Sequence, residues 1–326
     1  MRLRRDNNCK SKSKSRSKSK SKSKSKSKNL DCADVCEKVR NIRMSHNKIN
    51  PSMNDMPGWH GFASSDAAAP VTLLLHGFMG RAQDWRPVVE EISPTCRCLC
   101  PDLPGHGALR HDPGVTAMDM AQTADFLVKG LDAQGISRCA LAGYSMGGRL
   151  ALYLAVHYPE RFTCLILESA SPGLADARER KQRLAQDAAL ADRLAGMTEG
   201  SDGFEAFLQD WYRQEIFHTL KERQELLETL VRHRLANHPP ALAEALRGLG
   251  PGAQPSLWRA LDTLALPTLV LAGGEDLKFC GIAEAMRTRL PDGMLEIVAG
   301  CSHAPHLEEP RKCALFFKRF VHDHMP

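Results

Sequence analysis

Apolar and polar positions alternate in blocks along the chain from about residue 70 onward. Short apolar runs typical of buried strands occupy residues 71–75, 96–102, 139–143, 163–168, 266–273 and 294–300. Stretches with helical spacing lie between them, including residues 81–92, 116–134 and 146–157. Strands separated by helices of this length indicate a parallel sheet with right-handed crossovers, so the pattern predicts an α/β fold.

Residues 174–250 interrupt this alternation. They are rich in Ala, Leu, Arg, Glu and Gln and contain no strand-like run, so they predict three or four helices. The simplest architecture is one sheet domain over residues 58–326 with a helical cap at about residues 172–258. Ligands of open α/β sheets bind at the carboxyl ends of the strands, so we expect the cap to cover the site.

The N-terminal segment has a different composition. Residues 10–28 form a Lys/Ser repeat without any apolar side chain. Such a segment has nothing to bury against the entropy of ordering, so we predict that residues 1–57 are a disordered basic extension. It is either an arm for nucleic acid or anionic lipid, or an extension without function upstream of a start at Met44, Met53 or Met56, and we favour the latter. A plastid or mitochondrial address fits less well, because the arm has few Arg and no amphipathic pattern.

Charge and hydropathy narrow the classes of function. Residues 1–50 hold 17 Lys and Arg against 4 Asp and Glu, so the overall charge of +6 leaves −7 on the remainder. The net negative charge of the predicted folded part does not favour binding to nucleic acid. Only the basic arm would support such binding. No apolar run approaches the roughly 18 residues of a membrane span, and we expect no membrane partner.

Cysteine usage favours a reducing compartment. Eleven cysteines in 326 residues do not make a disulfide scaffold. Cys96, Cys98 and Cys100 alternate within a strand-like run, where a thiol behaves as a small hydrophobic group. Cys32 and Cys36 lack the second pair that would complete a zinc site. We therefore predict a cytoplasmic protein with no metal and no cofactor, and the sequence leaves its oligomeric state open.

The most specific chemical motif is Gly-x-Ser-x-Gly at residues 143–147, placed between a predicted strand and a predicted helix. A bare serine is a weak nucleophile or base, so it needs a histidine and an acid. Asp276 and His303 each follow a predicted strand, which places both on loops at the edge of the sheet that carries the serine. The chain order Ser, acid, His is typical of this fold, so we predict Ser145, Asp276 and His303 as a catalytic triad.

The tripeptide His-Gly-Phe at residues 76–78 follows the first predicted strand, where such folds place half of an oxyanion hole. We predict that the backbone N–H groups of Phe78 and Met146 are its two donors. For His76 we expect a role in bracing this loop.

Two more histidines stand in the motifs. We expect structural roles for His106 and His306. The spacing of His303 and His306 also suggests a pair of ligands, but the sequence shows no evident partner acid.

Taken together, these motifs resemble those of the 2-succinyl-6-hydroxy-2,4-cyclohexadiene-1-carboxylate synthases of menaquinone biosynthesis, which have the α/β-hydrolase fold. The resemblance covers about residues 71–326. It is carried by LHGFMG (75–80), DLPGHG (102–107), GYSMGGR (143–149), PGL (172–174), DWY (210–212), GGEDLKF (273–279) and HAPHLEEP (303–310). One departure is Cys301-Ser302 before the histidine, where relatives usually carry Gly-His.

The resemblance implies a lyase that uses the triad to remove a ring proton and releases pyruvate without hydrolysis. It also implies a tricarboxylate substrate bound by the following side chains: Tyr144, Arg149, Arg183, Trp211 and Arg234. Independently of the resemblance, Arg suits fixed pairing with carboxylates better than Lys does. Arg149 lies one helical turn after Ser145, so it can face the same side of the helix.

Two other functions remain open at this point. The same triad and oxyanion hole would serve a hydrolase of a carboxylate-bearing ester, thioester or C–C substrate. A binding protein that works through its basic arm is the second alternative, but it does not explain a complete triad.

Overall fold

The computed structural model describes residues 58–62, 69–112 and 114–324. The basic extension predicted for residues 1–57 lies outside these described residues. A seven-stranded sheet forms the centre of the fold, in the order β1-β3-β2-β4-β5-β6-β7. Only β1 runs antiparallel to its neighbour, and the other pairs are parallel. The strands are β1 (Trp59–Phe62), β2 (Val71–Leu75), β3 (Arg97–Pro101), β4 (Cys139–Tyr144), β5 (Phe162–Glu168), β6 (Thr268–Gly273) and β7 (Gly293–Val298).

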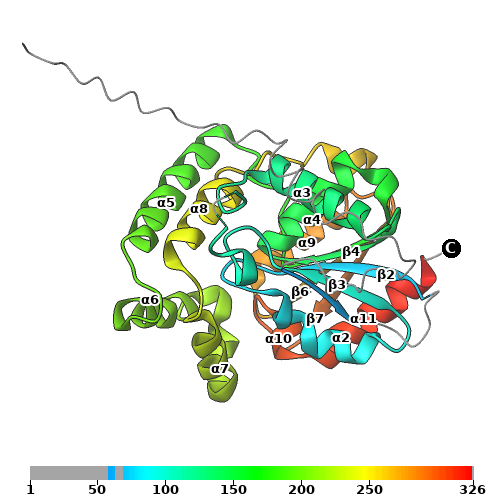
Figure 1. Cartoon of the computed structure of the whole chain (residues 1–326). Helices are drawn as coiled ribbons and strands as arrows, with labels where there is room; N and C mark the ends of the chain where they lie inside the picture. Colours follow the sequence, from blue (N-terminus) through cyan, green and yellow to red (C-terminus); the bar gives the residue numbers. More distant parts are fainter. Residues whose placement is uncertain (1–57, 63–68, 113, 325–326) are drawn as a thin grey trace, which may run out of the picture. The chain divides into compact units, whose positions relative to one another are not determined.

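Helices cover both faces of the sheet (Figure 1). One face carries α3 (Met120–Ala133), α4 (Met146–His157) and α9 (Leu277–Arg287), and the other carries α2 (Arg86–Ile92) and α11 (Pro310–Asp323). Consecutive side chains of a strand point to opposite faces, so Leu73 and Leu75 pack in one apolar core and Leu74 packs in the other. The predicted α/β-hydrolase fold, with a mostly parallel sheet between helices, is confirmed.

Between β5 and β6 the chain forms a helical insertion, which we call the cap (Figure 1). It consists of α5 (Ala177–Ala195), α6 (Asp202–Tyr212), η4 (Glu215–Glu222), α7 (Gln224–Arg234) and α8 (Pro239–Leu249). Phe204, Phe207 and Leu208 share one face of α6 by helical spacing and belong to a third apolar core within the cap. The side chain of Ser201 accepts a hydrogen bond from the N–H of Phe204 and thereby caps the start of α6.

The remaining elements of the described residues are short. They are η1 (Ala82–Trp85), η2 (Gly107–Leu109), η3 (Pro159–Arg161), η5 (Ala260–Thr263) and α10 (Pro305–Glu308). The helix predicted at residues 81–92 is divided at Arg86 into η1 and α2, and Pro87 occupies the first turn of α2, where its missing N–H costs nothing. Strand β1 was not predicted, because four residues are too few to show a periodic pattern. None of the described helices combines the length and the apolar character needed to cross a membrane.

Candidate active site

Ser145 stands at the sharp turn between β4 and α4. Its backbone has φ +49° and ψ −107°, an unfavourable conformation for a residue with a side chain. The glycines on either side make this turn possible. A Cβ on Gly143 would lie 2.3 Å from the carbonyl oxygen of Gly147, and a Cβ on Gly147 would lie 2.2 Å from that of Leu75. The turn therefore brings the start of α4 directly against the end of β2.

The structure brings the three predicted triad residues together. Nε2 of His303 lies 3.0 Å from Oγ of Ser145, and Nδ1 of His303 lies 2.8 Å from Oδ2 of Asp276. Asp276 and His303 are almost completely buried. The other oxygen of Asp276 accepts a hydrogen bond from the N–H of Phe279 at 3.2 Å, which caps α9 and fixes the carboxylate. With its Nδ1–H donated to Asp276, a neutral His303 presents Nε2 as an acceptor for the serine hydroxyl.

The two amides predicted for the oxyanion hole are free to bind a ligand. Phe78 lies in the loop after β2, and Met146 is the first residue of α4. Within the part of the chain that the structure describes, neither of their N–H groups donates to a protein acceptor. Both belong to segments that the close approach of Gly147 to the end of β2 brings together. Such amides can stabilise negative charge on a substrate oxygen.

Arg149 occupies an unusual electrostatic position. It is only 8% exposed, and its guanidinium contacts the side-chain oxygen of Gln254 at 3.3 Å. Among the described residues it forms no ion pair within 4 Å. Burial lowers the pKa of Arg149 to about 10, and the nearby Arg183 adds to this effect, while Asp187 opposes it. The side chain therefore stays charged at neutral pH, with its positive charge only partly compensated.

Three other side chains predicted to contact the substrate, Arg183, Trp211 and Tyr144, each contact a different part of the protein. Arg183, on α5, forms an ion pair with Asp187 one helical turn later, at 2.7 Å. Trp211, on α6, is partly exposed and meets the ring of Phe78 edge-on at a centroid distance of 5.7 Å. The ring of Tyr144 lies against Gly77, and burial raises the pKa of this tyrosine well above its usual value. Contact of these side chains with a substrate stays a prediction.

Arg234, at the end of α7, has its nitrogens directed to protein acceptors. Its two terminal nitrogens donate to the two oxygens of Asp84 at 2.9 and 2.6 Å, and Nε donates to the hydroxyl of Tyr212 at 3.2 Å. Both members of this ion pair are buried. Burial alone would raise the pKa of Asp84, but the Arg234 guanidinium beside it holds this pKa below its usual range. The resemblance implies a substrate contact for Arg234, which stays a prediction, and no sequence pattern indicates Asp84 as its partner.

Comparisons with known proteins show the family to which the chain belongs. The model of the alpha/beta hydrolase family matches residues 72–314. The chain is 36% identical over 259 residues to the 2-succinyl-6-hydroxy-2,4-cyclohexadiene-1-carboxylate synthase of Pectobacterium atrosepticum. The match covers 78% of this chain and 96% of that protein. The chain belongs to the α/β-hydrolase family, among the proteins similar to this synthase. MenH from S. aureus has a similar structure, with a TM-score of 0.77 and 29% identity over 82% of this chain and 99% of that chain.

A plant protein also contains a related segment. The chain is 30% identical over 270 residues to Protein PHYLLO, chloroplastic, of Arabidopsis thaliana. The match covers 78% of this chain but 16% of that much longer protein. This α/β-hydrolase module is thus found both by itself and within a larger chain.

Two groups near the histidine loop of this α/β hydrolase were not found from the sequence. The partner acid of His306, which the sequence did not reveal, is Glu168 at the end of β5, 2.7 Å from Nδ1 of the histidine. Ser302, just before the catalytic histidine, donates its hydroxyl and its N–H to Glu308 at 2.9 and 3.0 Å. Thr219 of the cap also donates to Glu308, so the histidine loop is tied to η4.

The spacing of His303 and His306 suggests a pair of ligands, but the structure gives each histidine separate partners. His303 bonds to Ser145 and Asp276, and His306 bonds to Glu168. Among the described residues, no three His, Cys, Asp or Glu side chains are grouped as metal ligands. The described cysteines are free thiols and most of them are buried, including the alternating Cys96, Cys98 and Cys100.

Proposed function

We propose that this protein is a lyase that eliminates pyruvate from 2-succinyl-5-enolpyruvyl-6-hydroxy-3-cyclohexene-1-carboxylate to give 2-succinyl-6-hydroxy-2,4-cyclohexadiene-1-carboxylate, a step of menaquinone biosynthesis. A ring C–H bond breaks, its electron pair moves through the ring to form the new double bond, and the C–O bond to the enolpyruvyl group breaks. The enolate that leaves takes up a proton and becomes pyruvate. No water is consumed, and no acyl-enzyme is formed.

The triad supplies the base for this elimination. Ser145 donates its hydroxyl proton toward Nε2 of His303, and the serine oxygen becomes able to accept the ring proton. Asp276 holds the Nδ1–H of His303, which orients the ring and stabilises the imidazolium that forms. The 3.0 and 2.8 Å separations of these groups support a proton relay without rearrangement. As the ring proton leaves, charge develops on substrate oxygen, and the amides of Phe78 and Met146 are suited to bind it.

The buried charge of Arg149, which the protein only partly compensates, is the observation that most supports this substrate. It lies one turn of α4 behind Ser145, and its contact within the protein is the neutral Gln254. Burying an arginine without a partner charge is unfavourable in the free protein. An anionic ligand that pairs with the guanidinium removes this cost when it binds. A tricarboxylate fits this requirement. We assign Arg149 to one carboxylate, and Arg183, Tyr144 and Trp211 to the surrounding contacts.

The deciding experiment measures the reaction class directly. Purified protein is given the succinylated enolpyruvyl substrate, and released pyruvate is quantified with lactate dehydrogenase and NADH. Parallel reactions contain a series of nitrophenyl esters, and Ser145→Ala is the inactive control. We expect pyruvate release from the wild type and little ester turnover. Ester hydrolysis without pyruvate release would instead identify a hydrolase of carboxylate-bearing substrates and refute the lyase.

Cytoplasmic localisation stays a prediction, and so does the absence of a catalytic role for residues 1–57. The chloroplastic designation of the Arabidopsis relative supports testing a plastid address as the alternative. A fluorescent fusion of the whole chain, compared with one that starts at Met53, separates the two locations. Equal pyruvate release by both purified forms is expected if the extension takes no part in the chemistry.

A further inference from the structure

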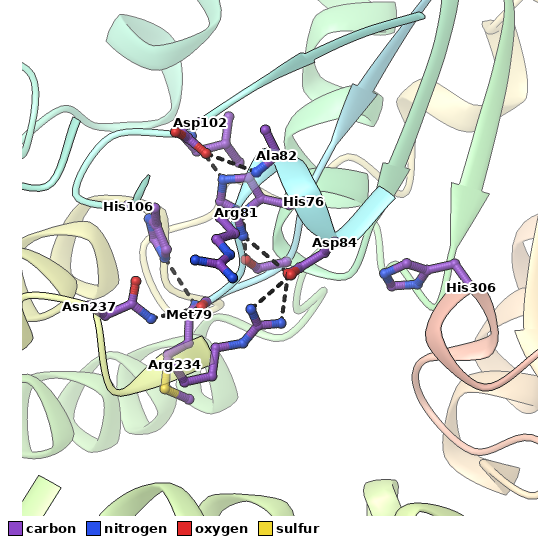
Figure 2. Close-up of polar contacts among 12 residues, drawn as sticks. His76, Met79, Arg81, Ala82, Asp84, Asp102, His106, Arg234, Asn237 and His306 are labelled. Atoms are coloured by element: carbon purple, nitrogen blue, oxygen red, sulfur yellow. Dashed lines mark hydrogen bonds and ion pairs between the residues drawn. The ribbon is translucent and has the colours of Figure 1, made fainter. Parts of the chain in front are cut away.

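The loop after β2 that carries the Phe78 amide is held in an unfavourable backbone conformation. Met79 has φ +61°, in the left-handed region that residues with side chains rarely adopt. The hydrogen bonds on both sides of this residue explain how it persists. Its N–H donates to Nε2 of His106 at 3.0 Å, and its carbonyl oxygen accepts from the side-chain amide of Asn237 at 2.8 Å. Figure 2 shows these two partners approaching Met79 from different segments.

The direction of the Phe78 N–H is fixed through the same loop. In a trans peptide the carbonyl oxygen and the following N–H point in opposite directions, so the Gly77 oxygen determines where the Phe78 N–H points. That oxygen accepts from Nδ1 of His76 at 2.8 Å and from the N–H of Gly80 at 3.0 Å. Nε2 of His76 accepts the N–H of Leu103 at 2.9 Å, as expected for a residue that braces the loop.

The cap contributes two of the contacts that hold this loop. Asn237, just after α7, binds the Met79 carbonyl, and Arg234, at the end of α7, binds both oxygens of Asp84 (Figure 2). Oδ2 of Asp84 also accepts the N–H of Arg81 at 3.1 Å, so the ion pair is connected to the backbone of the loop. The end of α7 thus holds the segment that follows Phe78 at two residues, Met79 and Asp84.

The loop has little room to adapt if these contacts are lost. A Cβ at Gly80 would lie 2.8 Å from both Asp84 Oδ2 and the Gly77 oxygen. Asp84 accepts the N–H of Arg81, the neighbour of Gly80, so a shift of Asp84 displaces the hydrogen bond from Gly80 to the Gly77 oxygen and with it the peptide that carries the Phe78 N–H. An oxyanion donor is effective only when it already points at the developing charge, so small displacements reduce the reaction rate.

We propose that the end of α7 positions the oxyanion loop, and that Arg234 and Asn237 act on the reaction through Asp84 and Met79 instead of by touching the substrate. The cap is then part of the catalytic apparatus, because its docking orients the Phe78 amide. This inference rests on the oxyanion role given to Phe78 in the proposed function. It assigns Asp84, Arg234 and Asn237 as positioning residues.

Asn237→Ala is the deciding variant, because it removes a neutral donor and leaves no buried charge unpaired. We expect kcat to fall by about 10- to 100-fold. This effect is larger than that of losing one neutral hydrogen bond and smaller than that of losing an oxyanion donor. KM should stay within about twofold of the wild-type value. Thermal melts confirm that the variant is folded. An unchanged kcat, or an effect confined to KM, would overturn the proposal.

Asp84→Asn separates positioning from substrate binding by Arg234. If Arg234 acts through Asp84, this variant lowers kcat and leaves KM nearly unchanged. If Arg234 binds a substrate carboxylate, releasing it from Asp84 should lower KM, and Arg234→Gln should raise KM; this pair of results contradicts the proposal. Arg232→Gln, an exposed arginine two positions earlier on α7, is the matched control and should behave as the wild type.

Failure of the lyase assignment can be recognised independently. The wild type alone reports on the proposed function, whereas the ratio of variant to wild type reports on the loop. If the wild type releases no pyruvate but hydrolyses nitrophenyl acetate, the same ratio is measured on ester turnover, which also develops an oxyanion. A kcat ratio near one for Asn237→Ala on the reaction that the wild type catalyses refutes the positioning role.

Discussion

Glu168 and His306 connect the serine turn to the histidine loop. Oε1 of Glu168 accepts hydrogen bonds from the N–H and from Nδ1 of His306, at 3.0 and 2.7 Å. The backbone oxygen of Glu168 accepts the N–H of Ser145 at 2.9 Å. One residue at the end of β5 thus contacts both the turn that presents Ser145 and the segment that follows His303. These contacts hold the two segments in place relative to each other.

Removal of this acceptor should destabilise the fold. Glu168→Ala leaves two buried donors of His306 unpaired, which costs about 3 kcal/mol. For a domain of this size that lowers Tm by about 6–12 °C. Glu168→Gln keeps an acceptor oxygen and should lose less than half as much. Differential scanning calorimetry of the three proteins tests this, and an unchanged Tm for Glu168→Ala would show that the contact is dispensable.

The triad should behave as one unit. Ser145→Ala and His303→Ala are each expected to reduce kcat by several orders of magnitude, because the serine cannot act as a base unless the histidine accepts its proton. The double variant should be little worse than either single variant. Steady-state pyruvate release measures all three. Strictly multiplicative losses would mean that the two side chains act separately.

How much of the site the sequence reveals depends on the separation of the interacting residues. Ser145, Asp276 and His303 were identifiable because each has a position defined by a strand that ends just before it. The Arg183–Asp187 pair has helical i, i+4 spacing and is visible in the sequence. Asp84 and Arg234 are 150 positions apart, and Glu168 and His306 are 138 apart. No local pattern links such partners, because the packing of the cap and of α10 decides which side chains meet.

Arg234 shows the related difficulty for a role carried over by resemblance. An arginine at a matching position is equally compatible with a substrate contact and with an internal ion pair. The structure shows an ion pair with Asp84, which supports the internal role, and the kinetics of Asp84→Asn and Arg234→Gln decide between the two roles. By contrast, β2, β4 and β5 are nearly continuous apolar runs separated by stretches with helical spacing, and this pattern predicts the sheet directly from the sequence.

Acid should weaken the fold through His106. Burial lowers the pKa of His106 to about 3 from 6.5, and neighbouring His76 contributes to the shift. Above pH 6.5 the side chain is neutral in both states, so its stabilising contribution is fully present. Below that pH the unfolded chain takes up a proton that the folded protein excludes. The free energy of unfolding should then fall by about 1.4 kcal/mol per pH unit.

His106→Gln isolates this contribution, because glutamine can accept the Met79 N–H but does not titrate. Urea unfolding between about pH 4 and pH 8 should give a shallower acid dependence for this variant, by close to one proton. The other titrating groups are shared by both proteins and cancel in the difference. Identical pH slopes for the two proteins would show that His106 takes up its proton as readily in the folded state as in the unfolded state, which contradicts the lowered pKa.

Arg149 provides the sharpest test of an anionic substrate. Loss of a charged hydrogen bond in a partly desolvated site costs roughly 2–5 kcal/mol, so Arg149→Ala should reduce kcat/KM by about 30- to several thousand-fold. Arg149→Lys should restore only part of this, because an ammonium group cannot make the paired contact of a guanidinium. Tm should stay the same or rise, since the arginine bonds only to Gln254 among the described residues and its burial is unfavourable without an anion. Arg178→Ala, at an exposed position on α5, is the control and should retain wild-type kinetics. Steady-state pyruvate release and thermal melts on the four proteins decide the matter: full activity in Arg149→Ala excludes a carboxylate anchor, and unfolding of that variant would make the arginine a structural brace.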